Sequence, residues 1–457
     1  MIHKYCLNGI YVAVDTNSGS VHIIDKIVYD ILDFLEPPLT KEMPQELILN
    51  LNYPLEEIKE AYSEIVKLYE ANTLFSKEVK PNVSFSANEA IPIKSACLHI
   101  SHDCNLRCRY CFASTGNFGG RRENMPLEVG KRAINFLIKR SLNRKNLEVD
   151  FFGGEPLLNF EVVEGIVDYA RSLEQQNNKK FRFTITTNGI NLDSHKIDFV
   201  NKEMSNVVLS IDGRKAVNDY MRITPNGSGT YDIILPKFKE LVTKRGFKNY
   251  YVRGTFTKNN LDFTNDVLHL ADLGFDQISI EPAALDQHLP YAIDETSLAR
   301  ICSEYETLMN KIIERAKQKK YFNFFHFSVN SQHAPCLSKR IKGCGAGTEY
   351  IAVTPSGDIY PCHQFVGAPE YIMGNVIDST FQTEKQAQFA NVNIYSKIGC
   401  NECWAKYYCS GGCNANNFKF EHNILQPYKI NCHLQKKRLE CAFVLHAILN
   451  SEQSIPA

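Results

Sequence analysis

Three cysteines within one short segment, Cys104, Cys108 and Cys111, constrain this chain more than any other feature of its sequence. In a 4Fe–4S cluster each iron takes one cysteine thiolate. Three thiolates therefore hold three irons and leave the fourth iron free to bind another molecule, which suits chemistry rather than simple electron transfer. We predict a 4Fe–4S cluster at these three cysteines, in a fold that also places the molecule bound by the open iron beside them.

Two other uses of three close cysteines are weaker. Zn²⁺ prefers a closed tetrahedron of four nitrogen or sulfur ligands, and only His99 and His102 lie nearby in the sequence. Disulfides require an oxidising compartment, and no hydrophobic signal segment opens the sequence. We therefore expect reduced cysteines and a cytoplasmic protein.

Length and charge exclude several classes of partner. The chain has 457 residues, enough for two or three domains. Lys plus Arg and Asp plus Glu both number 51, so the net charge favours neither nucleic acid nor an anionic membrane. Apolar runs stay well short of the roughly 20 residues that span a bilayer. We expect neither nucleic acid nor membrane as a partner.

The fifteen cysteines fall mainly into two groups, three at 104–111 and eight between 336 and 432. Metal clusters explain both groups in a reduced protein. Four cysteines stand alone, and we interpret them as small buried apolar side chains: Cys6, Cys97, Cys302 and Cys441.

Residues 1–78 form a separate unit in this interpretation. Apolar runs at 11–14 and 21–24 flank a polar turn at 15–20, which predicts a β-hairpin. Three helical patterns follow, and the last carries an apolar stripe of Ile58, Tyr62, Ile65 and Tyr69. A hairpin with three helices is winged-helix-like, and its strand edge can bind an extended peptide. Acidic side chains disfavour the alternative of DNA binding, namely Glu46, Glu56, Glu57, Glu60 and Glu64.

Residues 79–93 have no period and indicate a linker. Strands and amphipathic helices then alternate through residues 94–320. The predicted strands are 96–100, 147–152, 181–187, 207–211, 250–256 and 277–281. Six βα units predict an α/β fold, a partial (β/α)6 barrel, with ligands at the carboxyl ends of the strands.

The motifs at these strand ends resemble the radical S-adenosylmethionine (SAM) superfamily. Cysteines spaced C-x3-C-x2-C follow the first strand, Gly153-Gly154-Glu155-Pro156 ends the second, and Ser210-x-Asp-Gly and Asp-x-x-Arg222 follow the fourth. The resemblance implies that SAM chelates the open iron and is cleaved to a 5′-deoxyadenosyl radical. It further implies a set of cofactor contacts: Gly153, Gly154 and Glu155 at the SAM amino group, Ser210 and Arg222 at its carboxylate or ribose, Tyr110 against the adenine, and Asn188 nearby. The alternative for Ser210 and Arg222 is a plain strand-end turn and a surface arginine.

The second cysteine field is similar to the seven-cysteine SPASM extension of peptide-modifying radical SAM enzymes, which we assign to residues 321–457. The resemblance implies two auxiliary 4Fe–4S clusters, three in all. Cys400, Cys403, Cys409 and Cys432 would hold the distal cluster, and Cys344, Cys362 and Cys413 the proximal one. The fourth proximal ligand is left open between Cys336 and a cysteine thiolate of the substrate, and we favour the substrate.

The order of the three parts resembles the maturases of six-cysteine SCIFF peptides. That resemblance implies a Cys-rich precursor peptide held by its leader, an external electron donor, and a thioether bond from a cysteine sulfur to a carbon of another residue, commonly threonine. An anaerobic sulfatase maturase is the nearest alternative, although His363 stands where those enzymes typically have aspartate. Outside enzymes, the alternatives are an iron–sulfur electron carrier and a zinc-ribbon binding protein, which leave the glycine-rich and Ser-x-Asp-Gly motifs unexplained.

Overall fold

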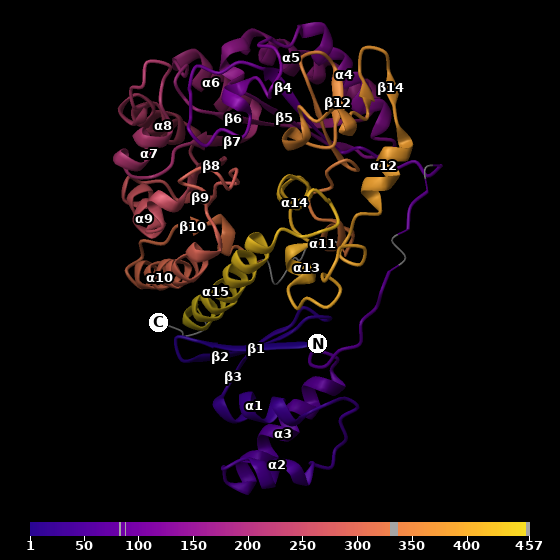
Figure 1. Cartoon of the computed structure of the whole chain (residues 1–457), viewed down its shortest axis with the longest axis vertical. Coiled ribbons are helices and arrows are strands. Elements are labelled where there is room, and N and C mark those ends of the chain that lie inside the picture. Colours follow the sequence, from indigo (N-terminus) through magenta and orange to yellow (C-terminus); the bar gives the residue numbers. More distant parts are fainter. Residues whose placement is uncertain (82–83, 87, 330–336, 454–457) are drawn as a thin grey trace.

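Six parallel strands form the centre of the molecule, a computed structural model that describes all residues except 82–83, 87, 330–336 and 454–457 (Figure 1). The strands pair in chain order: β4 (Ser95–Ser101), β5 (Asn146–Gly153), β6 (Lys180–Thr187), β7 (Met204–Ser210), β8 (Asn249–Phe256) and β9 (Gln277–Pro282). The predicted α/β partial barrel is confirmed. The fourth strand differs most from its predicted bounds, because it begins at Met204 and ends at Ser210, which leaves Ile211 in the following turn. The other strand ends lie within one residue of the prediction.

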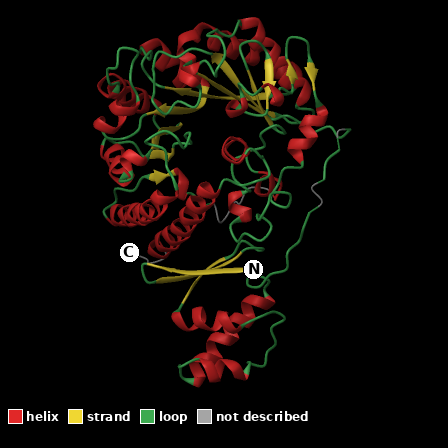
Figure 2. Cartoon of the chain, in the orientation of Figure 1, coloured by secondary structure: helices red, strands yellow, loops and turns green. Residues whose placement is uncertain are grey.

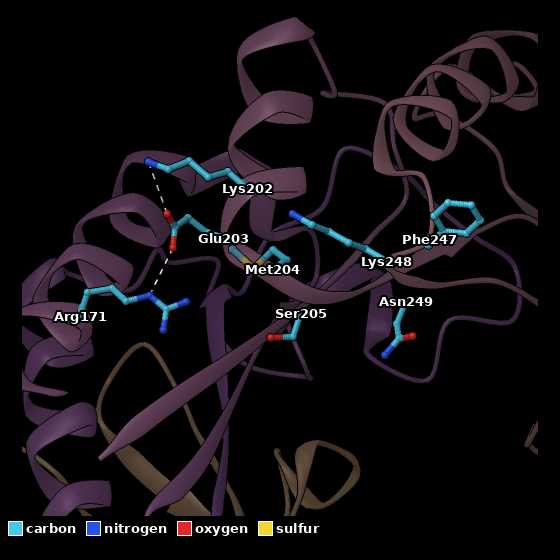
Figure 3. Close-up of a pocket in the computed structure, with 8 residues that line it drawn as sticks. All are labelled: Arg171, Lys202, Glu203, Met204, Ser205, Phe247, Lys248 and Asn249. Atoms are coloured by element: carbon cyan, nitrogen blue, oxygen red, sulfur yellow. Dashed lines mark hydrogen bonds and ion pairs between the residues drawn. The ribbon is translucent and has the colours of Figure 1, made fainter. Parts of the chain in front are cut away.

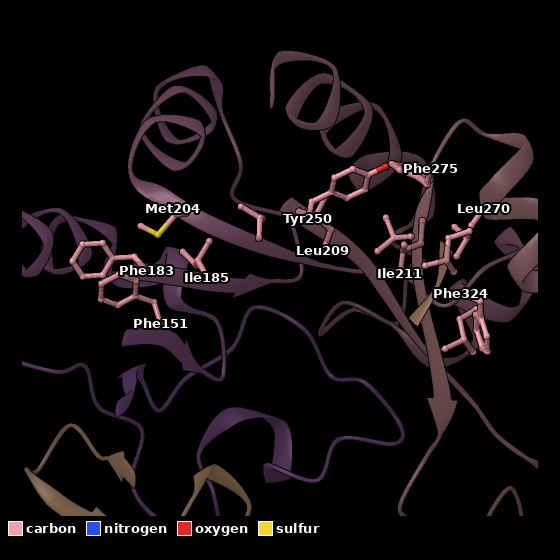
Figure 4. Close-up of a cluster of buried hydrophobic side chains, with 14 of the residues drawn as sticks. Phe151, Phe183, Ile185, Met204, Leu209, Ile211, Tyr250, Leu270, Phe275 and Phe324 are labelled. Atoms are coloured by element: carbon pink, nitrogen blue, oxygen red, sulfur yellow. The ribbon is translucent and has the colours of Figure 1, made fainter. Parts of the chain in front are cut away.

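Helices cover the outer face of this curved sheet, with the strands inside (Figure 2). They are α4 (Leu127–Arg140), α5 (Phe160–Asn177), α6 (Ser194–Glu203), α7 (Lys215–Met221), α8 (Tyr231–Arg245), α9 (Phe263–Asp272) and α10 (Leu298–Lys317). Alternate strand residues are fully buried against them, among them Phe151, Phe183 and Leu209 (Figure 4). Side chains alternate between the two faces of a strand, so the intervening, more polar residues line the inside of the barrel.

The C-terminal region extends the same sheet, which the sequence did not predict. β11 (Tyr350–Val353) pairs in parallel with β4, followed by antiparallel β12 (Asp358–Tyr360), β13 (Gly374–Asn375) and β14 (Thr380–Phe381). At the opposite edge, β10 (Asn323–Phe324) pairs with β9. The remaining helices of this region are α11 (Leu337–Lys342), α12 (Thr383–Ala390), α13 (Lys406–Cys409), α14 (Asn414–Glu421) and α15 (Lys429–Gln453).

The N-terminal unit contains the predicted hairpin and helices. β2 (Ile10–Asp15) pairs with β3 (Val21–Ile24), and α1 (Lys26–Ile31), α2 (Gln45–Asn50) and α3 (Leu55–Glu70) follow. One strand is additional, β1 (Ile2–Leu7), which makes β2 the central strand. Ala13 faces the unit's own core, whereas Val12 and Val14 belong to the large core of the rest of the chain. The small sheet is therefore buried on both faces.

The unit packs against the C-terminal region (Figure 1). The ring of His3 stacks on Trp404 at 3.9 Å, and the Tyr5 hydroxyl donates to the Glu440 carbonyl of α15 at 2.9 Å. The connecting segment is also bound, because the main chain of Phe85 both accepts from and donates to the Asn391 amide at 2.9 Å. Among the described residues, no helix is long and apolar enough to cross a membrane.

Candidate active site

The segment that carries the three cysteines leaves the carboxyl end of β4 and crosses the ends of the neighbouring strands. On one side, the amides of Gly154 and Glu155 donate to the carbonyls of Ser101 and Asp103 at 2.8 and 2.9 Å. On the other side, the amides of Arg107 and Arg109 donate to the chain after α7, at 2.7 and 2.9 Å. Backbone hydrogen bonds thus attach the cysteine segment to both sides of the strand ends.

Gly153 and Gly154 are required by this attachment. A Cβ atom at Gly153 would collide with the Ser101 carbonyl, and one at Gly154 with the Asp103 carbonyl. Gly153 also has a φ of +124°, a conformation that side chains disfavour. The two glycines therefore let the cysteine segment approach β5. Their predicted contact with the amino group of SAM stays a prediction.

Glu155 is buried, with 1% of its surface exposed. Its carboxylate accepts hydrogen bonds from the Thr187 hydroxyl at 2.7 Å, the Asn188 amide at 2.8 Å and the Leu157 amide at 3.1 Å. Burial raises the pKa of Glu155 to about 7, although all three hydrogen bonds oppose that rise. Glu155 consequently ties the end of β5 to the end of β6.

Asn188 contacts the cysteine segment directly. Its side-chain amide donates to the Asn105 side chain at 2.8 Å and lies 3.6 Å from the Cys104 sulfur. Its carbonyl oxygen accepts from the Ile190 amide at 3.0 Å. Asn188 thus lies beside the predicted cluster, as the sequence suggested.

Tyr110 and Arg222 meet at a carboxylate that the sequence analysis did not select. The Tyr110 hydroxyl donates to both oxygens of Asp212 at 2.7 and 2.9 Å, and Arg222 Nε lies 3.3 Å from one of them. Burial lowers the pKa of Arg222, but Tyr110, Asp212 and Cys108 outweigh it and raise that pKa overall. Asp212 is fully buried and also accepts from the Thr255 amide at 3.0 Å. The surface-arginine alternative is wrong, because Arg222 is only 9% exposed.

Ser210 ends β7 on the inner face of the barrel, beside Arg253 of β8. It is half-buried, and within the described part of the chain its hydroxyl makes no hydrogen bond. Arg222 Nε is likewise buried and makes no hydrogen bond there, although it is ion-paired with Asp212. Both groups are therefore available to a polar ligand near the cysteines.

The three cysteines of the first group are half-buried. Burial raises the pKa of Cys104 to about 12 and that of Cys108 to about 11. A bound metal cluster replaces these protons, because thiolates are its ligands. Among the described residues, no three His, Cys, Asp or Glu side chains are grouped to hold one metal ion.

His99 and His102 do not turn toward the cysteines. His99 Nδ1 lies 3.0 Å from His102 Nε2, and the ring of Phe118 packs against both. Burial lowers the pKa of His102 to about 4 and that of His99 well below its usual value. The two histidines form a neutral buried pair, which removes the nearby ligands that a zinc site would need.

The seven cysteines of the C-terminal field fall into two sets by their mutual electrostatic influence. After burial, the thiols that raise the pKa of Cys362 are Cys413 and Cys344. The thiols that raise the pKa of Cys432 are Cys409, Cys400 and Cys403, again after burial. The same two sets are the proximal and distal ligand groups that the SPASM resemblance implies, and their binding of clusters stays a prediction. Cys336 lies outside the described residues.

Of the four lone cysteines that were expected to be buried, Cys97 and Cys441 are buried, Cys302 is half-buried and Cys6 is exposed. Cys97 belongs to the same small core as Cys362, and Tyr350 packs against this core. β11 brings Tyr350 to this position by pairing with β4. The sequence could not show that Cys97 and Tyr350 are close in space, because they are 253 positions apart in the chain.

His363 lies beside Cys362 and faces the aromatic wall of the barrel. Its ring centre is 5.0 Å from that of Phe152, and its Nδ1 lies 3.4 Å from the Tyr350 hydroxyl. Burial lowers the pKa of His363 to about 4, Arg253 lowers it further, and Glu281 opposes them. Arg253 and Glu281 form an ion pair on β8 and β9. No motif in the sequence marks this ion pair. Its only signal is one charged residue on each of two predicted strands.

One pocket lies at the opposite end of the strands (Figure 3). It has a volume of about 440 Å³ and includes Met204 and Asn249, the first residues of β7 and β8. Its charged residues are largely paired, since Glu203 binds both Arg171 and Lys202. None of the predicted site residues line it, so it is separate from the cysteine sites.

Two segments of this chain match known protein families. Residues 98–256 match the radical SAM superfamily, and residues 344–404 match the SPASM iron–sulfur cluster-binding domain. The chain is 25% identical to the radical SAM cyclopropyl synthase TigE of Paramaledivibacter caminithermalis, over 75% of this chain and 72% of that protein. It is 24% identical to a cysteine-type anaerobic sulfatase-maturating enzyme of Clostridium novyi, over 69% of this chain and 86% of that protein.

Two solved structures share the fold. Native anSMEcpe with bound AdoMet has a TM-score of 0.65 and 21% identity, and covers 79% of this chain and all of that one. Streptococcus suis SuiB bound to the precursor peptide SuiA has a TM-score of 0.52 and 16% identity, and covers 94% of this chain and 98% of that one. The second match extends over the N-terminal unit as well as the barrel.

The chain thus carries a radical SAM domain, which implies a 4Fe–4S cluster and SAM, and an SPASM domain that binds additional iron–sulfur clusters. The residues present fit these groups. Three thiols, the Ser210 hydroxyl, which makes no hydrogen bond among the described residues, and the buried guanidinium of Arg222 lie around the same strand ends. A hydroxyl and a guanidinium suit the carboxylate or ribose of SAM.

Glu155 makes the stability of the metal-free protein depend on pH. The unfolded carboxyl titrates near 4.5 and the folded one near 7, so the unfolded state holds fewer protons between these values. The free energy of unfolding therefore falls as pH rises from about 5 to 8, by about 3 kcal/mol from this group. Denaturant unfolding across this pH range should show a smaller fall for Glu155→Gln, which resembles the protonated form. Equal falls in both proteins would contradict the assignment.

Proposed function

We propose that this chain, a radical SAM protein with an SPASM domain, installs a thioether bond between a cysteine sulfur and a carbon of another residue, commonly threonine, in a Cys-rich precursor peptide. The observation that carries the proposal is the grouping of Cys344, Cys362 and Cys413 as a set of three. Three protein thiolates leave one iron of the proximal cluster open to a substrate thiolate. The inner wall of the barrel, with Phe152 and His363, lies next to this set.

The residues of the site have distinct tasks in this proposal. When bound, the cluster and SAM supply a carbon radical that removes a hydrogen atom from the acceptor residue. Cys104, Cys108 and Cys111 hold that cluster, and Arg222 and Ser210 orient SAM at the strand ends. Asp212 orients Arg222 and Tyr110 through direct contacts. Cys344, Cys362 and Cys413 would hold the proximal cluster beside the substrate thiolate, and the auxiliary clusters would accept the electron released when that thiolate joins the acceptor carbon.

The N-terminal unit is proposed to hold the leader of the peptide by strand addition at β3. β3 pairs only with β2 within the described sheet, so its other edge is available to an extended peptide. Ile23 of β3 is 51% exposed. β1 cannot serve in the same way, because its side chains contact Trp404 and α15.

A sulfatase-type maturase is the second candidate, favoured by the similarity to the C. novyi enzyme. His363 in place of aspartate and the additional N-terminal unit count against it. The two reactions leave different products, since a thioether keeps the cysteine sulfur and formylglycine formation from cysteine removes it. TigE, by its name, forms a cyclopropyl group. Such a product contains no new bond to a cysteine sulfur.

The first test incubates the holoenzyme anaerobically with SAM, a reductant and a Cys-rich peptide from the adjoining gene. Mass spectrometry should show the loss of two hydrogens per bridge, full retention of sulfur and one thiol fewer for alkylation. Replacing Cys104, Cys108 and Cys111 together by Ala should abolish both the bridge and 5′-deoxyadenosine, with the auxiliary iron retained. Sulfur loss would instead support the sulfatase-type reaction, and SAM cleavage by the triple variant would refute the cluster assignment.

The second test concerns the β3 edge. Ile23→Asp should weaken peptide binding at least about tenfold, because a charge at the exposed edge opposes strand addition. Ile48→Asp is a matched control, since Ile48 is 45% exposed on α2. Peptide affinity can be measured by fluorescence anisotropy, and SAM cleavage without peptide should be equal in both variants. Unchanged affinity in the Ile23 variant would exclude leader binding at this edge.

The third test addresses the fourth ligand of the proximal cluster. If the substrate thiolate fills this position, Cys336→Ala should keep its iron and still form the thioether. Electron paramagnetic resonance (EPR) of the reduced wild-type protein should then change on addition of a Cys-containing peptide and stay constant with its Ser analogue. A loss of iron in Cys336→Ala, with no peptide-dependent change in the wild type, would assign the ligand to Cys336.

A further inference from the structure

Lys397 is a buried cation in the cysteine field. Only 3% of its surface is exposed. Its Nζ donates to the carbonyls of Gly411 and Gly412, at 2.7 and 3.3 Å. No carboxylate among the residues that the structure describes pairs with it. The other buried lysine of this region, Lys406, contrasts with it, because Lys406 Nζ lies 2.8 Å from a carboxylate oxygen of Glu78.

A buried ammonium without a negative partner is costly, so such groups normally pair with an anion. Carbonyl dipoles offset only part of that cost. A 4Fe–4S cluster on cysteine thiolates carries net negative charge and can supply the missing partner. The position of Lys397 therefore points to the predicted auxiliary clusters.

Hydrogen bonds link Lys397 to segments that carry cysteines of both ligand sets. Its carbonyl accepts from the amide of Cys400, a ligand of the distal set, at 3.2 Å. The turn that it holds lies between Cys409 of the distal set and Cys413 of the proximal set. A Cβ atom on Gly411 would lie 2.8 Å from Cδ of Lys397, which explains a glycine there in addition to its φ of +78°.

The electrostatic neighbours of Lys397 agree with this position. Burial lowers the pKa of Lys397, and the groups that oppose this fall are thiols from both sets. They are Cys400 and Cys409 of the distal set and Cys413 and Cys344 of the proximal set. No other cation in the field is placed among thiols of both sets in this way within the described residues; Lys436 acts on distal thiols, Cys400 and Cys432.

We propose that Lys397 is a shared counter-charge for the two auxiliary clusters, and that its ammonium raises the reduction potential of both. The inference rests on the presence of two clusters in the proposed function. Reduction adds one electron to a cluster and makes it more negative, so a nearby buried cation stabilises the reduced form. Lys397 thereby favours the auxiliary clusters as acceptors of the electron that thioether formation releases, and an external oxidised carrier then removes it. Lys397 is a positioning residue, since it contacts neither substrate nor SAM.

The test is an EPR-monitored potentiometric titration of the anaerobic holoenzyme. Lys397→Met should lower the potentials of both auxiliary clusters by about 59 mV, a tenfold change in the one-electron equilibrium constant. Lys397→Arg should restore them, because it keeps the charge. Lys436→Met is the matched control and should affect the distal cluster alone, and less strongly, because Lys436 is half-buried rather than fully buried. The potential of the SAM-binding cluster should be unchanged throughout.

Iron content separates the possible failures. Lys397→Gln keeps a hydrogen-bond donor for Gly411 and serves if the Met variant loses iron. Unchanged potentials in a neutral variant with full iron, or a shift in one cluster alone, would overturn the proposal of a shared charge. Loss of iron in the Arg variant as well would overturn it in favour of a purely structural role. Wild-type protein with iron for only one cluster would contradict the proposed function itself, before Lys397 is tested.

Discussion

The close approach of the cysteine segment to the end of β5 is the contact on which the site depends. Two amides of the turn after β5 donate to the carbonyls of Ser101, at the end of β4, and Asp103, and the lack of side chains at Gly153 and Gly154 allows this close approach. Glu155 then joins the turn to the end of β6, through the hydrogen bonds that its buried carboxylate accepts from Thr187 and Asn188. The glycine-rich motif therefore supports the segment that carries Cys104. Any contact of this motif with SAM would be made by backbone that these hydrogen bonds already hold in place.

A second carboxylate organises the other side of the site. Asp212 is buried at the end of β7 and receives Tyr110 from the cysteine segment, Arg222 from the chain after α7 and the Thr255 amide from β8. One carboxylate thus aligns three separate parts of the chain. It also keeps a buried guanidinium beside Cys108 at a low electrostatic cost, because the two charges compensate each other. The arrangement presents Arg222 to a ligand without leaving it unpaired.

The three parts of the chain form one structure rather than separate units. β11 joins the C-terminal region to the barrel sheet, and this pairing brings Tyr350 and Cys362 to the inner wall beside Cys97. The N-terminal sheet contributes Val12 and Val14 to the same large core. A peptide held at β3 would consequently be held at a defined position relative to the cysteine field.

The sequence by itself determined the local chemistry and the order of the elements. Apolar runs that alternate with amphipathic segments predicted the strands from Ala96 to Glu281, because that signal is local in the chain. The two ligand sets of the C-terminal field were implied by the resemblance of the cysteine pattern to the SPASM extension. Tertiary structure decided what depends on contacts between distant residues. The pairing of β11 with β4, the additional strand β1, the meeting of Tyr110 with Asp212, and the burial of Lys397 without a carboxylate have no local signal. Each arises from packing between segments that are distant in the sequence. Separation in the sequence does not predict distance in space.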